Sequence, residues 1–354
     1  MTAPAPLSSA DCDRLFEHLG DFSHILLAVS GGVDSTVLLH LICGWAQDQL
    51  QHRQAKGLAP LRISVACVDH GLRAGSAQEA QAVKDLAAQL GCDGAILHWS
   101  GDKPATRVQE TARDKRYDLL SAHARDIGAE AIILAHHADD QAETLLMRMA
   151  AGSGPEGLCG MRERMERDGL MLLRPLLAVP KAVLLATAHA HHWQWHEDPS
   201  NRQERFERVR LRQWQDLRDA LGLSSKRLGR LALRMQRQQE AIDQMLADNW
   251  TRLGHCEAGR IVLMGEIWSL PEEIRLRLLA KAVQTLCPET RVRLERLETV
   301  EATLNEAAKT GQTARRTLGG CVLTLANTGQ LSLTREPPRR EHKDLAREKA
   351  STTG

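Results

Sequence analysis

The sequence predicts an α/β fold: a doubly wound parallel sheet followed by helices and a small α+β C-terminal domain. Three observations lead to this fold class. Apolar runs of strand length recur in the first part of the chain, amphipathic segments of helical length separate them, and shorter elements follow after about residue 240. The chain has 354 residues, 43% of them hydrophobic, which is enough to bury a sizeable core.

The first part of the chain alternates strand and helix patterns. The expected strands are HILLAVS (24–30), RISVACVD (62–69), AILHW (95–99), AIILAHH (131–137) and LMLLRPLL (170–177). The expected helices occupy about 33–45, 76–90, 106–127, 140–151 and 180–191. Such alternation predicts a parallel sheet covered by helices on both faces, with ligands bound beyond the carboxyl ends of its strands.

The part after about residue 240 predicts a smaller α+β domain. We expect a strand at 261–268, helices after Pro271 and from Arg291, and a β region with turns at Gly319-Gly320 and Asn327–Gly329. Residues 336–354 are charged and have no apolar period, so we expect a disordered tail there.

Composition excludes some classes of protein. No apolar run approaches the roughly 18 residues of a membrane span, and the start has no basic segment before an apolar one, so we expect a soluble cytoplasmic protein without a membrane partner. The eight cysteines are far apart in sequence and form no C-x-x-C pair, which predicts buried free thiols. The net charge is +1, but residues 202–237 hold eleven Lys or Arg against four acids, which predicts a polyanionic partner.

The stretch SGGVDS, Ser30 to Ser35, lies between the first strand and the first helix. Its glycines let a phosphate approach the backbone N–H groups of the helix start, which predicts an anion cradle. No G-x-x-x-x-G-K-[ST] pattern occurs, so this is not the common P-loop with its lysine. Asp34 beside a phosphate needs a cation between them, which predicts Mg²⁺ on Asp34. The alternative is a helix start at which Asp34 and Ser35 only cap the first turn.

A second polar cluster follows the fourth strand, in AHHADDQAETLLMR at 135–148. Asp139, Asp140 and Glu143 are spaced to share one face of a helix, so they predict the binding of a cation. The alternative is a solvated acidic helix start favoured by the helix dipole. Taken alone, His70, His136 and His137 indicate hydrogen-bonded histidines at strand ends.

Two groups of arginines predict phosphate contacts. Arg113 and Arg116 lie on an expected helix whose other side packs, and they either face phosphate or form a solvated face. Further along, Arg205, Arg208, Arg210 and Arg212 surround Phe206, which offers a ring for base stacking. The alternative there is a charged surface helix with Phe206 in the core.

These motifs together resemble a known family. SGGVDS resembles the PP-loop of the ATP pyrophosphatases. The motifs that narrow the resemblance to the tRNA(Ile)-lysidine synthases are VDHGLR (68–73), QETARDKRYDLL (109–120), the stretch 135–148, GSGPEGLCGM (152–161), RPLL (174–177) and EDPSNRQERFERVRLR (197–212). The dense match covers 24 to about 212, and RRTLGGCVLTL with SLTRE extends it weakly. The resemblance implies a PP-loop ATPase fold, similar to the adenine nucleotide alpha hydrolases.

The resemblance also implies an activity: an RNA-modifying ligase that uses ATP and Mg²⁺ to adenylate C2 of the wobble cytidine in the CAU anticodon of tRNA(Ile). The ε-amine of free L-lysine then displaces AMP. We expect a monomer or homodimer. The implied ATP-binding residues are Ser30, Gly31, Gly32, Val33, Asp34, Ser35, His70 and Arg73. The implied catalytic residues are Asp34, which also holds the metal, with Asp139, Asp140 and Glu143, which receive metal or lysine ammonium. The implied tRNA-binding residues are Arg113, Arg116, Arg205, Arg208 and Arg212, and the GSGPEG loop belongs near the modified base.

Four segments follow from these features: a PP-loop catalytic domain at 1–215, a basic helical linker at 216–240, a small α+β tRNA-binding domain at 241–335 and the tail at 336–354. The chain departs from the family in two ways. Val209 stands where relatives usually have Asn, and from its length we expect the chain to lack the further C-terminal domain with which longer relatives grip tRNA.

Two rival functions stay open. A PP-loop tRNA thiolation enzyme shares the adenylation step but needs a sulfur carrier or cluster, and the missing C-x-x-C pairs argue against it. A non-catalytic nucleotide-binding module explains the cradle but leaves the carboxylates and arginines without a purpose.

Overall fold

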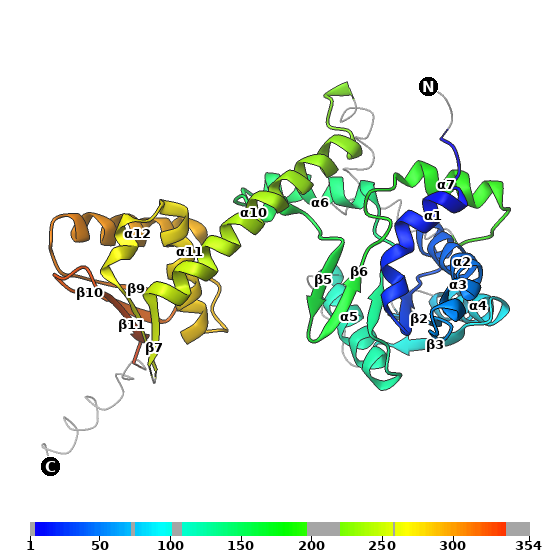
Figure 1. Ribbon diagram of the computed structural model, residues 1–354, viewed down its shortest axis with the longest axis horizontal. Coiled ribbons are helices and arrows are strands. Elements are labelled where there is room, and N and C mark those ends of the chain that lie inside the picture. The colour runs from blue at the N-terminus through cyan, green and yellow to red at the C-terminus, as the bar shows by residue number, and fades with distance from the viewer. Residues whose placement is uncertain (1–3, 72–74, 101–107, 197–219, 258, 338–354) are drawn as a thin grey trace, which may run out of the picture. The chain divides into compact units, whose positions relative to one another are not determined.

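A computed structural model of the chain describes residues 4–71, 75–100, 108–196, 220–257 and 259–337. The chain divides after Gln236 into two compact units (Figure 1). Across the described segments, no helix is both long enough and apolar enough to cross a membrane.

The first unit is built on a six-stranded sheet with the order β3-β2-β1-β4-β6-β5. Its strands are β1 (His24–Ala28), β2 (Arg62–Asp69), β3 (Asp93–His98), β4 (Ala131–Ile133), β5 (Arg164–Arg167) and β6 (Leu170–Leu173). The first four and β6 are parallel, which confirms the predicted sheet, whereas β5 pairs antiparallel with β6. Because β1 lies between β2 and β4, the segments that follow β1 and β4 emerge side by side.

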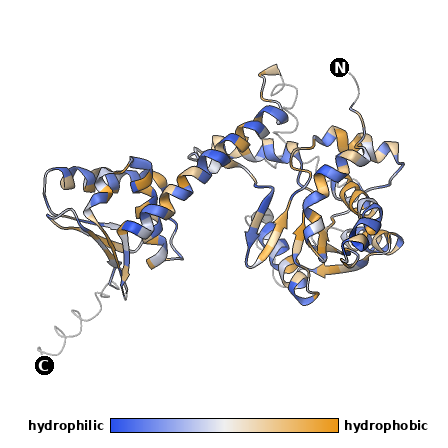
Figure 2. Ribbon diagram, viewed as in Figure 1, coloured by the Kyte–Doolittle hydropathy of each residue, from blue (hydrophilic) through white to orange (hydrophobic). Residues whose placement is uncertain are grey.

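Helices α1 (Ser9–Phe16), α2 (Val33–Asp48), α4 (Ser76–Gln89), α5 (Val108–Asp126) and α7 (Lys181–Ala190) cover the two faces of this sheet. The unit also contains α3 (Leu50–Ala55), α6 (Ala138–Ala150) and the short 3-10 turns η1 (Glu17–Asp21) and η2 (Gly157–Cys159). Side chains alternate along β1: Ile25 and Leu27 pack with α1, α2, α4 and α7, whereas Leu26 packs with α5. Figure 2 shows the sheet largely hydrophobic, with hydrophilic faces on the surrounding helices.

The second unit has a five-stranded antiparallel sheet with the order β7-β8-β11-β10-β9. Its elements are β7 (Gly254–Glu257), β8 (Arg260–Leu263), the 3-10 turn η4 (Gly265–Ser269), α11 (Glu272–Leu286), α12 (Leu294–Lys309), β9 (Ala314–Leu318), β10 (Cys321–Leu325) and β11 (Leu331–Arg335). The two helices share a core with the sheet, which confirms the predicted α+β arrangement.

Two details differ from the sequence prediction for this unit. The strand predicted at 261–268 ends at Leu263, because the chain turns at Gly265 against the backbone of Thr328, and the Trp268 indole N–H donates to the Gly329 carbonyl at 2.7 Å. Helix α10 (Ser225–Leu253) continues past residue 240, the end proposed for a basic linker. The other boundaries of the four-segment scheme stay predictions.

The prediction that the cysteines are buried free thiols is wrong at Cys256, which is exposed on β7. All eight are free, and five are buried. Folding brings distant cysteines into two close pairs: the Sγ atoms of Cys43 and Cys92 are 3.5 Å apart, and those of Cys287 and Cys321 are 3.6 Å apart. Separation along the sequence therefore did not indicate separation in space.

Candidate active site

The SGGVDS loop joins the end of β1 to the start of α2. Gly32 is the N-cap of α2, and because glycine has no side chain to accept from the first-turn N–H groups, these donors are left for a ligand. Gly31 has φ +84°, and a Cβ there would come within 3.2 Å of a Val83 methyl group. The loop therefore has the glycines and the exposed helix start that an anion cradle requires.

The two serines of the loop hold it closed. Ser35 Oγ donates to the Gly32 carbonyl at 3.0 Å and accepts the Ser30 N–H at 3.1 Å, and the two serine hydroxyls are 3.2 Å apart. Ser35 is buried. Its side chain therefore fixes the shape of the cradle from inside.

A cavity of about 330 Å³ opens at this edge of the sheet. Its polar lining consists of Ser30, Gly32, Asp34, Ser35, Glu79, Arg116, His136, Asp140, Lys181 and His196. Its apolar lining includes Ala66 and Val68 of β2 together with Leu120, Leu134 and Ala135. Such a combination of an apolar wall with converging polar groups is typical of a small-molecule site.

Asp34 lies between two basic groups. Its Oδ2 atom is 3.3 Å from Lys181 Nζ and 3.5 Å from His137 Nε2. Burial favours the neutral acid, but His137 and Lys181 outweigh burial and hold the pKa of Asp34 below its usual range. Asp34 is therefore ionised at neutral pH.

The other oxygen of Asp34 suits a metal ion. Oδ1 is buried and has no hydrogen-bond partner within the described segments. Asp140 contributes a second carboxylate to the same cavity, with its Oδ2 3.5 Å from His137 Nε2. Mg²⁺ in nucleotide sites is commonly held by one or two carboxylates and by phosphate oxygens, so these residues fit the predicted ion.

His137 connects the two carboxylates and starts helix α6. Its Nδ1 accepts the Asp139 N–H at 3.2 Å, and Asp140 Oδ2 accepts the His137 N–H at 3.0 Å, which completes a capping box. The proton of the neutral ring therefore lies on Nε2, which faces Asp34 and Asp140. Burial favours the neutral ring, but these carboxylates outweigh it and raise the pKa of His137.

Asp139 has different surroundings from Asp140. Its Oδ2 accepts the backbone N–H of Lys181 at 2.8 Å, and its Oδ1 accepts the hydroxyl of Ser225 at 2.7 Å. These bonds tie the start of α6 to the starts of α7 and α10. Glu143 is 1% exposed on α6, and neither it nor Asp139 lines the cavity. Only Asp140 of the three predicted carboxylates therefore shares the cavity with Asp34.

The remaining predicted residues are distributed more widely. Arg116 lines the cavity, whereas the Arg113 guanidinium lies 5.4 Å from the centre of the Tyr117 ring. His70 packs edge-on against Trp99, and Val33 is buried, so it offers only its backbone N–H to the cradle. The predicted residues that lie outside the described segments are Arg73, Arg205, Phe206, Arg208, Arg210 and Arg212.

The second half of the GSGPEGLCGM loop (152–161), residues 157–161, is held by three side chains. Gln141 accepts the Met161 N–H at 2.7 Å and donates to the Met161 carbonyl at 2.8 Å. Arg148 donates to the carbonyls of Gly157 and Gly160, and Gln236 of α10 donates to those of Cys159 and Met161. The loop is thus held against α6 by bonds to its backbone.

Sequence reasoning missed several residues of the cavity. Lys181 is the first residue of α7, and its position after the last parallel strand was a usable signal, because that strand ends at the same edge as β1. His196 had no signal of this kind. Its N–H donates to the Gly31 carbonyl at 2.9 Å, which brings a segment far along the chain over the cradle.

A fold-level relative exists among solved structures. A U34-tRNA thiolase from Methanococcus maripaludis, which carries a [4Fe-4S] cluster, superposes with a TM-score of 0.54 at 15% identity and covers 66% of this chain and 78% of its own. At this identity the likeness shows a shared fold.

Sequence comparison identifies the family. A PP-loop domain matches residues 7–215. The tRNA(Ile)-lysidine synthase of Methylobacterium sp. (strain 4-46) is 45% identical over 332 residues, covering 92% of each chain. That of Bradyrhizobium diazoefficiens is 39% identical over 360 residues, covering 96% of this chain and 97% of its own. The chain therefore belongs to the tRNA(Ile)-lysidine synthase family of PP-loop proteins.

Proposed function

We propose that this chain ligates free L-lysine to C2 of the wobble cytidine in the CAU anticodon of tRNA(Ile), using ATP and an adenylated tRNA intermediate. The observation that carries the proposal is one cavity in which the SGGVDS cradle, Asp34, Asp140 and Lys181 meet, in a chain of this family. We expect this reaction to take place in the cytoplasm. The predicted oligomeric state is a monomer or homodimer.

The cradle and its neighbours would bind ATP. The N–H groups at the start of α2 face the phosphates, and Lys181 supplies the cation that the SGGVDS sequence lacks. Asp34 Oδ1 and Asp140 would hold Mg²⁺, which neutralises negative charge on the phosphate oxygens. The apolar wall formed by Ala66, Val68 and Leu134 is where the adenine base would pack.

Two displacements follow from this placement. The C2 oxygen of cytidine attacks the α-phosphorus of ATP, a P–O bond to pyrophosphate breaks, and the helix N–H groups with Lys181 absorb the charge on the leaving group. The lysine ε-amine then attacks C2, and the C2–O bond breaks as AMP leaves. Asp140 is the best placed of the three carboxylates to meet the lysine amine or the metal, because it alone lines the cavity.

Arginines would contact the tRNA. Arg116 lines the cavity and Arg113 lies one turn earlier on the same helix, so both suit phosphates near the anticodon. The family motif assigns Arg205, Arg208 and Arg212 to tRNA, and we expect the second unit to bind tRNA as well. The GSGPEGLCGM loop, held at residues 157–161, would offer a surface beside the target base.

The test measures AMP release and the incorporation of labelled lysine into tRNA. We expect lysine incorporation to require ATP, the CAU-bearing tRNA and L-lysine together. Dependence on a sulfur donor would instead indicate thiolation, and no turnover under any condition would indicate a binding module.

A variant pair tests the cradle in the same assay. Asp34→Ala should abolish AMP formation, because the metal loses one of its two anionic ligands, while the protein stays folded at the assay temperature although loss of the contacts with Lys181 and His137 lowers its Tm. Asp48→Ala, an exposed change at the other end of α2, is the matched control and should retain full activity. Near-normal AMP formation by Asp34→Ala would refute the metal role.

A further inference from the structure

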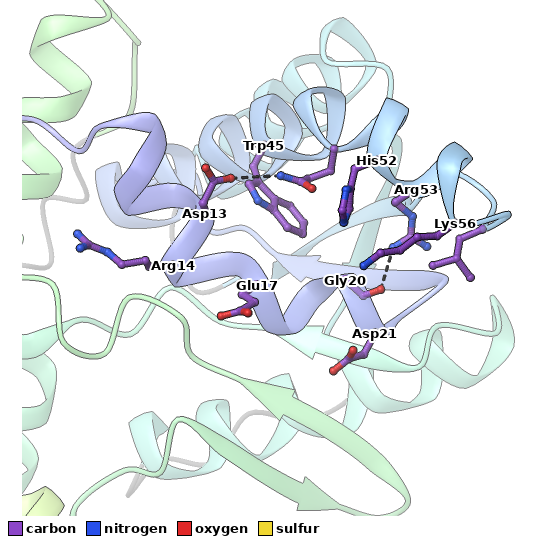
Figure 3. A pocket seen from close by; sticks show the side chains of 11 residues that line it. Asp13, Arg14, Glu17, Gly20, Asp21, Trp45, His52, Arg53 and Lys56 are labelled. Atoms are coloured by element: carbon purple, nitrogen blue, oxygen red, sulfur yellow. Dashed lines mark hydrogen bonds between the residues drawn. The ribbon is translucent and has the colours of Figure 1, made fainter.

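The first unit has a second and larger cavity, of about 600 Å³, far from the cradle. It lies between α1 with η1 on one side and the end of α2 with α3 on the other (Figure 3). Because α2 has 16 residues at about 1.5 Å each, its length separates this cavity from the cradle by about 24 Å. None of the residues that line it belongs to the proposed lysine-ligation site.

Trp45 contributes an unsatisfied donor to this cavity. The side chain is 6% exposed and packs edge-on against Phe16, with ring centres 5.9 Å apart. Its indole Nε1–H is buried and has no acceptor anywhere in the described chain. Buried indole N–H groups normally have a hydrogen-bond partner, so the missing acceptor points to a ligand atom.

Arg53 contributes a buried positive charge. It is 7% exposed and donates to three carbonyls, those of Ala59 at 2.8 Å, Gly20 at 2.9 Å and Phe22 at 3.1 Å. These bonds fix the guanidinium but supply no counter-charge, and no described carboxylate forms an ion pair with it. Since a guanidinium has five N–H donors, two remain for an anionic group. A buried cation without an anion favours binding of a carboxylate or phosphate.

The charges on the two walls of the cavity have opposite signs. Asp13, Glu17 and Asp21 come from α1 and η1, and His52, Arg53 and Lys56 come from α3 and the residue after it (Figure 3). On the acidic wall, Arg14 is paired with Asp11, and Asp13 accepts a hydrogen bond from Gln49 at 3.2 Å. Glu17, Asp21 and Lys56 have no ion pair within the described segments. An anion alone would meet the acidic wall, and a cation alone would meet the basic wall.

We propose that this cavity binds a small zwitterion, with a carboxylate at one end and an ammonium group at the other. The carboxylate would accept from the Trp45 indole and the remaining Arg53 donors beside Lys56, and the ammonium group would lie between Glu17 and Asp21. The volume leaves room for more than a single amino acid, so we take a dipeptide as the class of zwitterion. This site is additional to the proposed ligation of lysine and is tested without ATP or tRNA.

The test follows the Trp45 indole N–H signal in the ¹⁵N-labelled full chain, identified by its loss in Trp45→Phe. L-alanyl-L-alanine is the probe, with acetate and ethylamine as its two halves. We expect the chemical shift of this signal to change with dipeptide concentration until it reaches a plateau. With acetate or ethylamine at the same concentration, we expect no plateau. No saturable movement up to about 10 mM, or equal saturation by acetate alone, would overturn the proposal.

Exposed charges on each wall locate the site without risk to the fold. Lys56→Gln and Glu17→Gln should each weaken dipeptide binding about twofold to fivefold, as removal of one exposed ion-pair partner does. Calorimetric titration of Trp45→Phe should show a loss of about tenfold or more, because a donor to a charged acceptor is removed. The matched controls, Lys309→Gln and Glu298→Gln on α12, should bind as the wild type. Wild-type affinity in both wall variants would also overturn the proposal.

Discussion

Replacing Asp139 and Asp140 separately with asparagine should damage the protein in two different ways. The two residues are neighbours on α6, but Asp139 accepts from the Lys181 backbone and from Ser225, whereas Asp140 lines the cavity with Asp34. In Asp139→Asn the remaining oxygen can accept the Lys181 N–H, and the new NH₂ group can donate to the Ser225 hydroxyl once that hydroxyl turns. Two charge-assisted bonds therefore become neutral ones.

The sizes of the two effects follow from these contacts. A hydrogen bond to a charged group is stronger than its neutral counterpart by about 1 kcal/mol, so weakening two such bonds in Asp139→Asn should lower the free energy of unfolding by about 2 kcal/mol. For a unit of this size the loss corresponds to a fall in Tm of about 4–8 °C. Asp140→Asn keeps an oxygen to accept the His137 N–H, so its cost in stability should stay below about 1 kcal/mol. It removes a negative charge from the cavity, so its loss should appear in AMP formation or in the lysine KM.

Calorimetry of the folded variants and the lysine-incorporation assay measure the two effects independently. We expect a lowered Tm for Asp139→Asn, with activity retained below the transition. We expect a near-native Tm for Asp140→Asn, with activity lost. An Asp139→Asn protein that unfolds like the wild type but needs far more lysine would refute the positioning role. Equal loss in Asp139→Asn, Asp140→Asn and Glu143→Gln at an unchanged lysine KM would leave only metal binding.

Three further predictions concern other parts of the chain. Lys181→Met should raise the ATP KM about tenfold or more, because the cradle has no other lysine, and an unchanged KM would exclude this role. Burial lowers the pKa of His24, so below about pH 6.5 the unfolded chain binds a proton more readily than the folded chain and the free energy of unfolding falls. Denaturant unfolding at a series of pH values should show a smaller fall for His24→Gln than for the wild type. Parallel curves of stability against pH for the two proteins would contradict this. Arg208→Ala and Arg212→Ala, outside the described segments, should each flatten the slope of log tRNA affinity against log salt by about one unit or less, and wild-type slopes would indicate a solvated face.

Apolar patterning was sufficient to predict the five parallel strands, because each of them carries an apolar run, but it did not predict their order in the sheet. Apolar patterning failed where a segment is buried without pairing as a strand, or pairs as a strand without being buried. The run 131–137 was predicted as one strand, but β4 ends at Ile133, and Leu134 to His136 line the cavity instead. Strand β5 was missed because its sequence is RMER, and an edge strand needs only backbone pairing with its neighbour.

Only the part of the site that follows from the strand ends of the parallel sheet could be predicted from the sequence. The rule that ligands bind at the carboxyl ends of parallel strands correctly brought Asp34 and Asp140 into one cavity. The same rule could not distinguish Asp139 from Asp140, because the partners of Asp139, Lys181 and Ser225, lie 42 and 86 residues away. Helical spacing indicates which residues share a face of a helix, but contacts with distant parts of the chain decide which hydrogen-bond partners each residue has.

The central place of β1 in the sheet affects how the chain folds during synthesis. β1 is the first strand made, yet one of its two neighbours, β4, is made about 100 residues later, as the pairing of Leu26 with Ile132 requires. At a synthesis rate of about 5–20 residues per second, one edge of β1 stays unpaired for about 5–20 seconds. During that time its apolar side chains and backbone donors are open to other nascent chains. During synthesis, β1 must therefore be kept from aggregating until β4 has emerged from the ribosome. Only then can the cradle that follows β1 take its final place in the sheet.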